Sequence, residues 1–188
     1  LKEVTQIGAE LVNDDSSAAD AEIIATVIDC FNEIGISDSQ IEIGQIDYFK
    51  SLVAESGISE DEEDQIKEYI HIKNFFGLEE YVDALDISDS LKKAFVAFDS
   101  LFGGISMLDK AEGYVSNETS LEAVKRLRRV YAALECYGYQ DHISFDLGML
   151  DGYNYYTGII FRGYTYGTGD AVVKGGRYNN LLKQFGKD

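Results

Sequence analysis

The sequence contains no proline, only two cysteines and no long uninterrupted apolar run. About nine prolines would be usual at this length, but their absence points to no function. No apolar stretch approaches the ~20 residues that a membrane-spanning helix needs, and no charged leader precedes an apolar segment. We therefore expect a cytoplasmic protein without membrane contact. Residue 1 enters directly on a strand pattern and residue 188 stops just past a predicted helix, so we expect a fragment, with one domain that carries an insertion.

Cysteine and histidine are too sparse to suggest a metal site or a disulfide. Cys30 and Cys136 lie in helical patterns without CxxC spacing, which predicts buried, reduced thiols. His71 and His142 stand alone, so neither indicates a zinc or general-base site. The acidic run at 60–64 falls where a helix begins, which the helix dipole favours, and neighbouring acids on a helix point apart. We predict no metal and no cofactor.

Basic residues are few, and the charge is unevenly distributed. The formal net charge is −18, and residues 1–140 carry 29 acidic and 11 basic side chains, whereas the remainder carries five of each. A surface this acidic repels phosphate backbones, and we therefore expect no nucleic-acid partner. The one basic cluster lies on a predicted helix and is interpreted as a solvated face or a protein contact; it comprises Lys125, Arg126, Arg128 and Arg129.

The first 46 residues show a strand, a helix and a second strand. Residues 1–13 have strand character, with Gln6, Gly8 and Glu10 on one face by the period of two. An exposed face of an antiparallel strand would look the same. Ser16 and Ser17 offer N-caps for a helix over 18–34. A short strand follows at 41–46.

Residues 47–140 read as consecutive helices, which we predict at 47–56, 60–76, 78–85, 88–102 and 119–137. In the last of these, Thr119 and Glu122 suggest a capping box. We expect this region to be a helical insertion into a core formed by residues 1–46 and 141–188. The fold class predicted is α+β: an antiparallel sheet flanked by helices.

The C-terminal part returns to strands rich in tyrosine and glycine. Residues 142–148 alternate as an antiparallel strand does, and Asp151-Gly152 is a turn signal. We predict further strands at 155–164 and 171–174, joined by a hairpin turn at 167–170. Gly175-Gly176 is expected to allow close backbone approach before a helix from Tyr178, whose N-terminal amides could hold an anion, although Gly-Gly-Arg alone could simply be a turn.

Four short motifs occur in an order that resembles a known family. They are Gln6-x-x-x-Glu10, Asp20-Ala21-Glu22, Tyr155-Tyr156-Thr157-Gly158 and Gly175-Gly176-Arg177-Tyr178. Together they are similar to the class II catalytic core of histidyl-tRNA synthetase, and more closely to the synthetase-derived regulatory subunit of ATP phosphoribosyltransferase. The resemblance covers most of the chain outside the helical region. It implies a class II synthetase-like sheet and a histidine site formed by Gln6, Glu10, Tyr155, Tyr156, Gly175 and Gly176.

One departure from the synthetase pattern bears on catalysis. The synthetase has Arg-Gly-Leu-Asp before the tyrosine pair, and its arginine assists adenylate formation; here the segment begins with Asp151. An aspartate would repel the anionic groups that arginine stabilises. By resemblance, Glu10 and Tyr156 would still hydrogen-bond an imidazole, and Gln6 would help to hold the amino-acid end. We therefore expect that no residue of this chain is catalytic.

The resemblance thus implies a non-catalytic subunit that binds L-histidine and transmits feedback inhibition to the catalytic subunit of ATP phosphoribosyltransferase, in the first step of histidine biosynthesis. It also implies a homodimer within a hetero-oligomer. Two alternatives stay open. One is a histidyl-tRNA synthetase core that activates histidine with ATP and charges tRNA, and the other is a structural paralogue that does neither.

Overall fold

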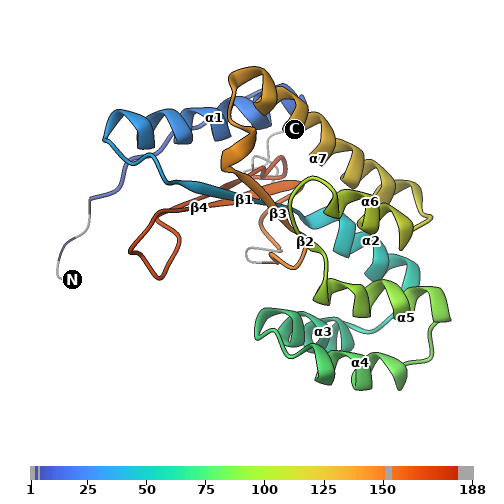
Figure 1. Ribbon diagram of the computed structural model, residues 1–188. Coiled ribbons are helices and arrows are strands. Elements are labelled where there is room, and N and C mark those ends of the chain that lie inside the picture. Colours follow the sequence, from blue (N-terminus) through green and yellow to red (C-terminus); the bar gives the residue numbers. More distant parts are fainter. Residues whose placement is uncertain (1–2, 4, 151–153, 182–188) are drawn as a thin grey trace.

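A five-stranded mixed sheet organises the chain. The computed structural model describes residues 3, 5–150 and 154–181 (Figure 1). The strands run in the order β2-β3-β1-β4-β5, with β1 parallel to β3 and every other neighbouring pair antiparallel. Their bounds are β1 (Gln40–Gln45), β2 (Phe102–Gly103), β3 (Ile143–Asp146), β4 (Ile159–Tyr164) and β5 (Val173–Gly176).

Helices lie on both sides of this sheet. Figure 1 shows α1 and α7 together on one side, with α3, α4 and α5 grouped well away from them. The helices are α1 (Ser17–Glu33), α2 (Ile46–Ser56), α3 (Glu60–His71), α4 (Phe75–Asp83), α5 (Asp89–Val96), α6 (Met107–Gly113) and α7 (Glu118–Tyr137), with 3-10 turns η1 (Ala97–Asp99) and η2 (Gln140–His142). None of the helices in the described ranges is long and apolar enough to cross a bilayer.

The two faces of β1 have different environments because successive side chains of a strand alternate. Ile41 and Ile43 are fully buried in the core that also contains the apolar faces of α1 and α7. Glu42 lies on the other face, in register with Arg162 of β4. One face of the sheet is therefore closed by helices, while the other carries polar side chains.

The hydrophobic core extends from the sheet into the helical region. Phe49 of α2 makes edge-to-face contacts with Phe95 of α5 and Phe98 of η1, and these rings belong to the same buried cluster as Ile41 and Ile43. The helix α7 packs against both α1 and α2. The division into a sheet core and an insertion at 47–140 stays a prediction.

Several predicted elements are confirmed with small shifts in their ends. Ser16 accepts a hydrogen bond from the Ala19 amide and caps α1, as its position before the helix suggests. The acidic run at 60–64 does begin α3, where Ser59 and Glu62 form a capping box. The strand at 41–46 and the hairpin that joins β4 to β5 are also present.

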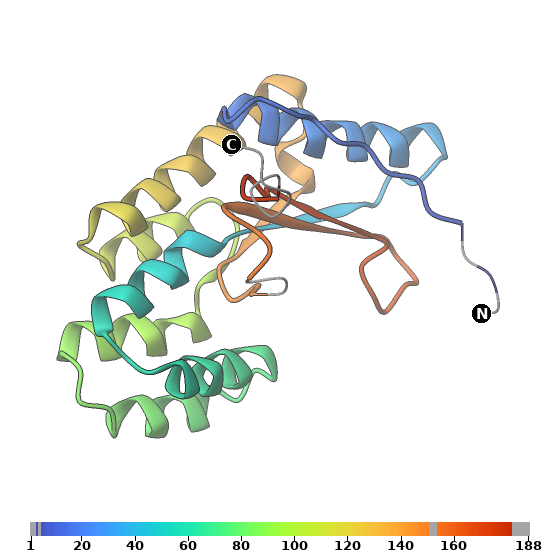
Figure 2. The same ribbon diagram turned by 180° about the vertical axis from the view of Figure 1, so that it is seen from behind.

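The N-terminal strand is not present. Residues 5–12 run as an extended but exposed trace, Asn13 has a positive φ of 68°, and in the described part of the chain no strand pairs with this segment. A strand is stable only when a neighbour takes up its backbone hydrogen bonds, and the period of two at Gln6 and Glu10 does not supply that neighbour. Figure 2 shows this segment running along α1 instead.

The helical prediction over 88–102 was too long. α5 ends at Val96, and the chain continues through η1 into β2, which pairs with β3 at Phe102. The helix α6 was missed. The capping box at Thr119 is also wrong, because Asn117 accepts the hydrogen bond from the Ser120 amide at 2.7 Å. Propensity alone does not distinguish between adjacent polar caps.

Three further predictions near the C-terminal strands need correction. β3 is parallel to β1 and antiparallel only to β2. β4 begins at Ile159, so Tyr155 lies in a turn before the strand and Tyr156 in the irregular segment that follows the turn. Gly175-Gly176 ends β5 rather than forming a turn. Residues 179–181 form a turn; the rest of the predicted helix and the Asp151-Gly152 turn lie outside the described residues.

Both cysteines are exposed, contrary to prediction. Cys30 and Cys136 lie within α1 and α7, each on the helix side that faces away from the core. The helical pattern located them on helices correctly but did not fix the buried face.

Replacing Ile43 with alanine should strongly destabilise the fold. Ile43 is fully buried at the centre of the sheet, and Ile-to-Ala changes in cores cost about 2–5 kcal/mol. Urea unfolding of the variant measures the loss. Ile34→Ala is the matched control, because Ile34 is 71% exposed after α1 and should change stability by less than about 0.5 kcal/mol. Equal effects of the two changes would contradict this description of the core.

Candidate functional site

Three tyrosines gather where β4 begins and β5 ends. The Tyr155 ring meets Tyr156 edge-on at 5.1 Å between centroids and stacks on Tyr178 at 5.3 Å. The Tyr156 ring packs against a small buried cluster made by Ile46, Met149 and Ile160. The backbone carbonyl of Tyr156 accepts a hydrogen bond from Lys50 Nζ at 3.1 Å. Tyr155 is 43% exposed, so this aromatic cluster is partly open to solvent.

The two glycines of β5 face opposite ways. A Cβ on Gly176 would lie 2.7 Å from the Tyr156 ring, so only glycine allows that ring to lie over the strand. A Cβ on Gly175 would instead collide with the ring of Phe161, which belongs to the main core. The structure therefore brings Gly176 together with the tyrosines, whereas Gly175 serves the close packing of the opposite face.

Glu10 lies within electrostatic range of Tyr156. The pKa of the Tyr156 phenol is raised by burial first, then by Tyr155 and by the Glu10 carboxylate. The phenol therefore stays protonated at neutral pH and can donate or accept a hydrogen bond. Gln6 and Glu10 are both exposed on the extended segment. The arrangement offers one carboxylate and one phenol to a ligand beside the tyrosines.

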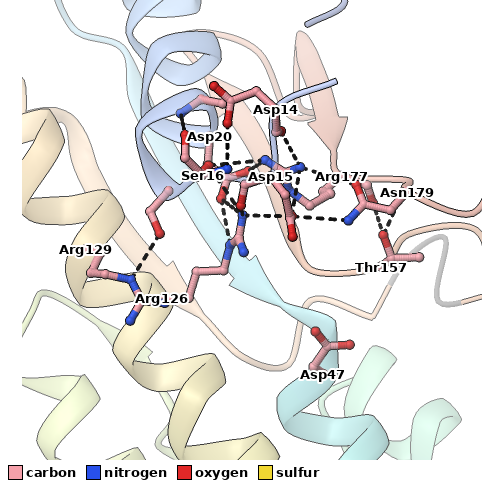
Figure 3. Close-up of polar contacts among 12 residues, drawn as sticks. Asp14, Asp15, Ser16, Asp20, Asp47, Arg126, Arg129, Thr157, Arg177 and Asn179 are labelled. Carbon is pink, nitrogen blue, oxygen red and sulfur yellow. Dashed lines mark hydrogen bonds and ion pairs between the residues drawn. The ribbon is translucent and has the colours of Figure 1, made fainter. Parts of the chain in front are cut away.

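A buried carboxylate holds the start of α1 in place. The Asp20 side chain is only 5% exposed, and each of its oxygens accepts hydrogen bonds from a different arginine (Figure 3). Arg177 donates to Oδ1 through Nη2 at 2.6 Å and through Nε at 2.9 Å. Arg126 of α7 donates to Oδ2 through Nε at 2.8 Å. Charge-assisted bonds of this kind are among the strongest in proteins.

The same arginines also fix the chain just before α1. Arg177 Nη1 donates to the Asp14 carbonyl at 2.9 Å, and Arg126 Nη2 donates to the Asp15 carbonyl at 3.0 Å. The segment that carries Glu10 is therefore tied at its C-terminal end to β5 and to α7 (Figure 3). This network positions the N-terminal segment relative to Tyr156.

Sequence reasoning missed this network. Asp20 and Arg177 entered only as parts of motifs, and Arg126 as part of a solvated or partner-binding face. The basic cluster of α7 mostly pairs with acids of the chain itself: Arg128 with Asp109 and Glu112, and Arg129 with Glu122. The available signal was an aspartate in the first turn of an otherwise apolar helix face.

A second group of polar side chains lies on the face of the sheet opposite Ile41 and Ile43. Glu42 of β1, Asp146 of β3 and Arg162 of β4 line a cavity of about 400 Å³ together with Lys73, which follows α3. The pKa of Glu42 is raised, mainly by burial and then by Asp146. The pKa of Asp146 is raised by burial, although the Gly148 amide donates to Oδ1 at 2.7 Å. The sequence analysis identified none of these residues as a site.

Among the described residues, no group of histidines, cysteines and acids is arranged to hold a metal ion. His142 lies against Ser39, with Nδ1 2.9 Å from the Ser39 carbonyl oxygen, and His71 is exposed. Asp151, which the resemblance places opposite the synthetase's arginine, lies outside the described residues.

The mixed five-stranded sheet and its flanking helices match the catalytic domain of class II aminoacyl-tRNA synthetases. The family model described as histidyl-tRNA synthetase matches residues 1–188, so the chain belongs to this family. The family and the α+β fold class inferred from the motifs are thereby confirmed.

Within that family, the chain is similar to proteins named ATP phosphoribosyltransferase regulatory subunit. It is 44% identical to the one from Acetivibrio thermocellus over 186 residues, which is 99% of this chain and 44% of that protein. It is 39% identical to the one from Clostridium acetobutylicum over 190 residues, which is 100% of this chain and 47% of that protein. The chain therefore spans less than half the length of these relatives.

A solved structure agrees with this assignment. The crystal structure of an ATP phosphoribosyltransferase regulatory subunit/histidyl-tRNA synthetase from Bacillus halodurans matches with a TM-score of 0.84 and 31% identity. The match covers 93% of this chain and 46% of that one.

Replacing Asp20 with alanine should cost about 3 kcal/mol or more, because two largely buried arginines lose their shared partner. Thermal or urea unfolding measures the loss. The control is Arg129→Ala, which removes an exposed ion pair with Glu122 and should change stability little. A loss from Asp20→Ala no larger than the loss from the control would show that the network does not hold the segment.

Glu42→Gln should become more stable than the wild type as pH rises. The folded state raises the pKa of Glu42, so the wild type loses stability as pH rises from the ordinary value of 4.5 through the folded-state pKa, and glutamine does not. Urea unfolding at several pH values measures the difference. The control is Glu62→Gln: bonds from Ser59 lower the pKa of Glu62, so this variant should instead become less stable than the wild type as pH rises. Parallel pH curves for wild type and Glu42→Gln would contradict the placement of Glu42.

Proposed function

We propose that this chain is part of a regulatory subunit of ATP phosphoribosyltransferase and that it binds L-histidine for feedback control of the first step of histidine biosynthesis. The similarity to proteins carrying that name supports the assignment. The observation that supports histidine as the ligand is that the Glu10 carboxylate lies within electrostatic range of the Tyr156 phenol.

These two groups suit an imidazole. A carboxylate accepts a hydrogen bond from one ring N–H, and a protonated phenol can serve the other nitrogen in either direction. Such a pair discriminates against amino acids that lack the ring N–H, because their binding would leave the site's polar groups without partners. The exposed ring of Tyr155 and its stacked neighbour Tyr178 provide an apolar wall beside them.

The sequence before the tyrosine pair supports a non-catalytic role. Histidine activation brings a carboxylate and phosphates together and needs cationic stabilisation. The segment from Asp151 to Tyr156 contains no lysine or arginine. The site would therefore retain recognition of histidine without its activation, as a sensor requires.

The partner in this proposal is the catalytic subunit of ATP phosphoribosyltransferase, in a hetero-oligomer that contains a homodimer of the regulatory subunit. Regulation needs only that histidine binds with different affinities to two states of the complex. The acidic composition agrees with a partner other than nucleic acid. The location that we propose with this function is the cytoplasm.

A second candidate function is that of a histidyl-tRNA synthetase. The description of the matching family model favours it, as does the double name of the Bacillus halodurans structure. ATP–pyrophosphate exchange with the full-length protein and L-histidine separates the two functions. A regulatory subunit gives no exchange above background, and sustained exchange would support the synthetase.

Glu10→Ala in the full-length protein should weaken L-histidine binding more than tenfold, because a charged hydrogen bond is worth about 1.5–3 kcal/mol. Isothermal titration calorimetry measures the affinity. Glu33→Ala, at an exposed acid at the end of α1, is the control and should bind as the wild type does. Unchanged affinity in Glu10→Ala would remove Glu10 from the site, and absence of binding heat in the wild type would favour a structural paralogue.

A further inference from the structure

The two polar groups of the proposed histidine site come from opposite ends of the chain. Glu10 lies on an extended segment that pairs with no strand of the described residues, whereas Tyr156 lies just before β4. A carboxylate and a phenol can bind one imidazole together only if the distance between them is held, because hydrogen bonds weaken steeply as their geometry departs from the ideal. The contacts that join these two segments therefore determine the affinity for the ligand.

Arg177 joins the two segments, one through its backbone and the other through its side chain. The Thr157 amide, next to Tyr156 in the sequence, donates to the Arg177 carbonyl at 2.7 Å. Arg177 Nη1 donates to the carbonyl of Asp14, four residues after Glu10, at 2.9 Å. One residue therefore holds the segments that carry Tyr156 and Glu10.

Asn179 links the same two segments a second time. Its backbone amide donates to Thr157 Oγ1 at 2.9 Å, and its side-chain nitrogen donates to Asp15 Oδ1 at 3.3 Å. Figure 3 shows these contacts beside those of Arg177. The segment before β4 and the segment before α1 are thus joined by two residues that follow β5.

A third element, α7, enters this junction through Arg126. Arg126 donates to Asp20 Oδ2 through Nε at 2.8 Å and to the Asp15 carbonyl through Nη2 at 3.0 Å. Arg177 binds the other oxygen of Asp20, so the two arginines share one buried carboxylate. Both guanidinium groups are largely buried, and a planar fork held at several points has little freedom to move. A shift of α7 would therefore disturb the junction directly.

We propose that Arg126 of α7 is a positioning residue of the proposed histidine site. It holds the junction that sets the distance between Glu10 and Tyr156, and the affinity for histidine therefore depends on the position of α7. This inference rests on the proposed function, because it requires that L-histidine binds at these two residues. The dependence is mutual: a partner that displaces α7 lowers the affinity for histidine, and bound histidine opposes that displacement.

The test measures L-histidine binding to the full-length protein by isothermal titration calorimetry. Arg126→Met keeps an unbranched side chain but removes its donors, and the affinity should fall about fivefold or more. Arg126→Lys keeps a positive charge beside Asp20 but has no fork to reach the Asp15 carbonyl as well, so its melting temperature should stay near that of the wild type while the affinity still falls. Arg128→Met is the matched control on the same helix and should bind as the wild type does, because Arg128 pairs with acids of α6.

Combining Arg126→Met with Glu10→Ala gives a readout that a merely structural role would not move. If Arg126 acts by positioning Glu10, the change at Arg126 should alter histidine affinity much less once Glu10 is absent. An equal loss of affinity in both backgrounds would overturn the inference, as would binding by both Arg126 variants that matches the Arg128→Met control.

Those two results would leave the proposed function standing, because the wild type would still bind histidine more tightly than Glu10→Ala does. Absence of L-histidine binding by the wild type, or unchanged affinity in Glu10→Ala, would instead overturn the proposed histidine site and this inference with it.

Discussion

The arrangement of this protein depends on one buried carboxylate, Asp20, held between two arginines that lie far from it in the sequence. A carboxylate with 5% exposure is tolerated only when charged donors satisfy it. Arg177 follows β5 and Arg126 lies on α7, so their bonds join the start of α1 to the end of the sheet and to the longest helix. The position of the N-terminal segment, and with it that of Glu10, follows from this junction.

The sheet divides the molecule's chemistry between its two faces. One face is closed by α1 and α7 and contains the buried isoleucines of β1. The other face keeps its polar side chains and is left open enough for ligands. Glycine at 176 allows the Tyr156 ring to cover β5 there, and acids and bases follow one another across β3, β1 and β4.

Much of the local structure could be predicted from the sequence because it depends on near neighbours. The apolar spacing of 23–34 with Ser16 before it defines α1, the alternation of Ile41 and Ile43 defines β1, and the acidic start of α3 follows from the helix dipole. Motif order also identified the family and named Glu10 and Tyr156 as a pair.

Only the tertiary structure decided what depends on distant partners. Three features depend on which strands lie beside one another: residues 5–13 have no strand partner in the described chain, β3 pairs in parallel with β1, and Gly175 and Gly176 face opposite sides of the sheet. Likewise, neither the Asp20 network nor the cavity around Glu42 has a local pattern, because each joins residues more than a hundred positions apart. A sequence determines periodicity and caps directly, whereas burial, and the charge pairing that burial enforces, exist only once the chain has folded.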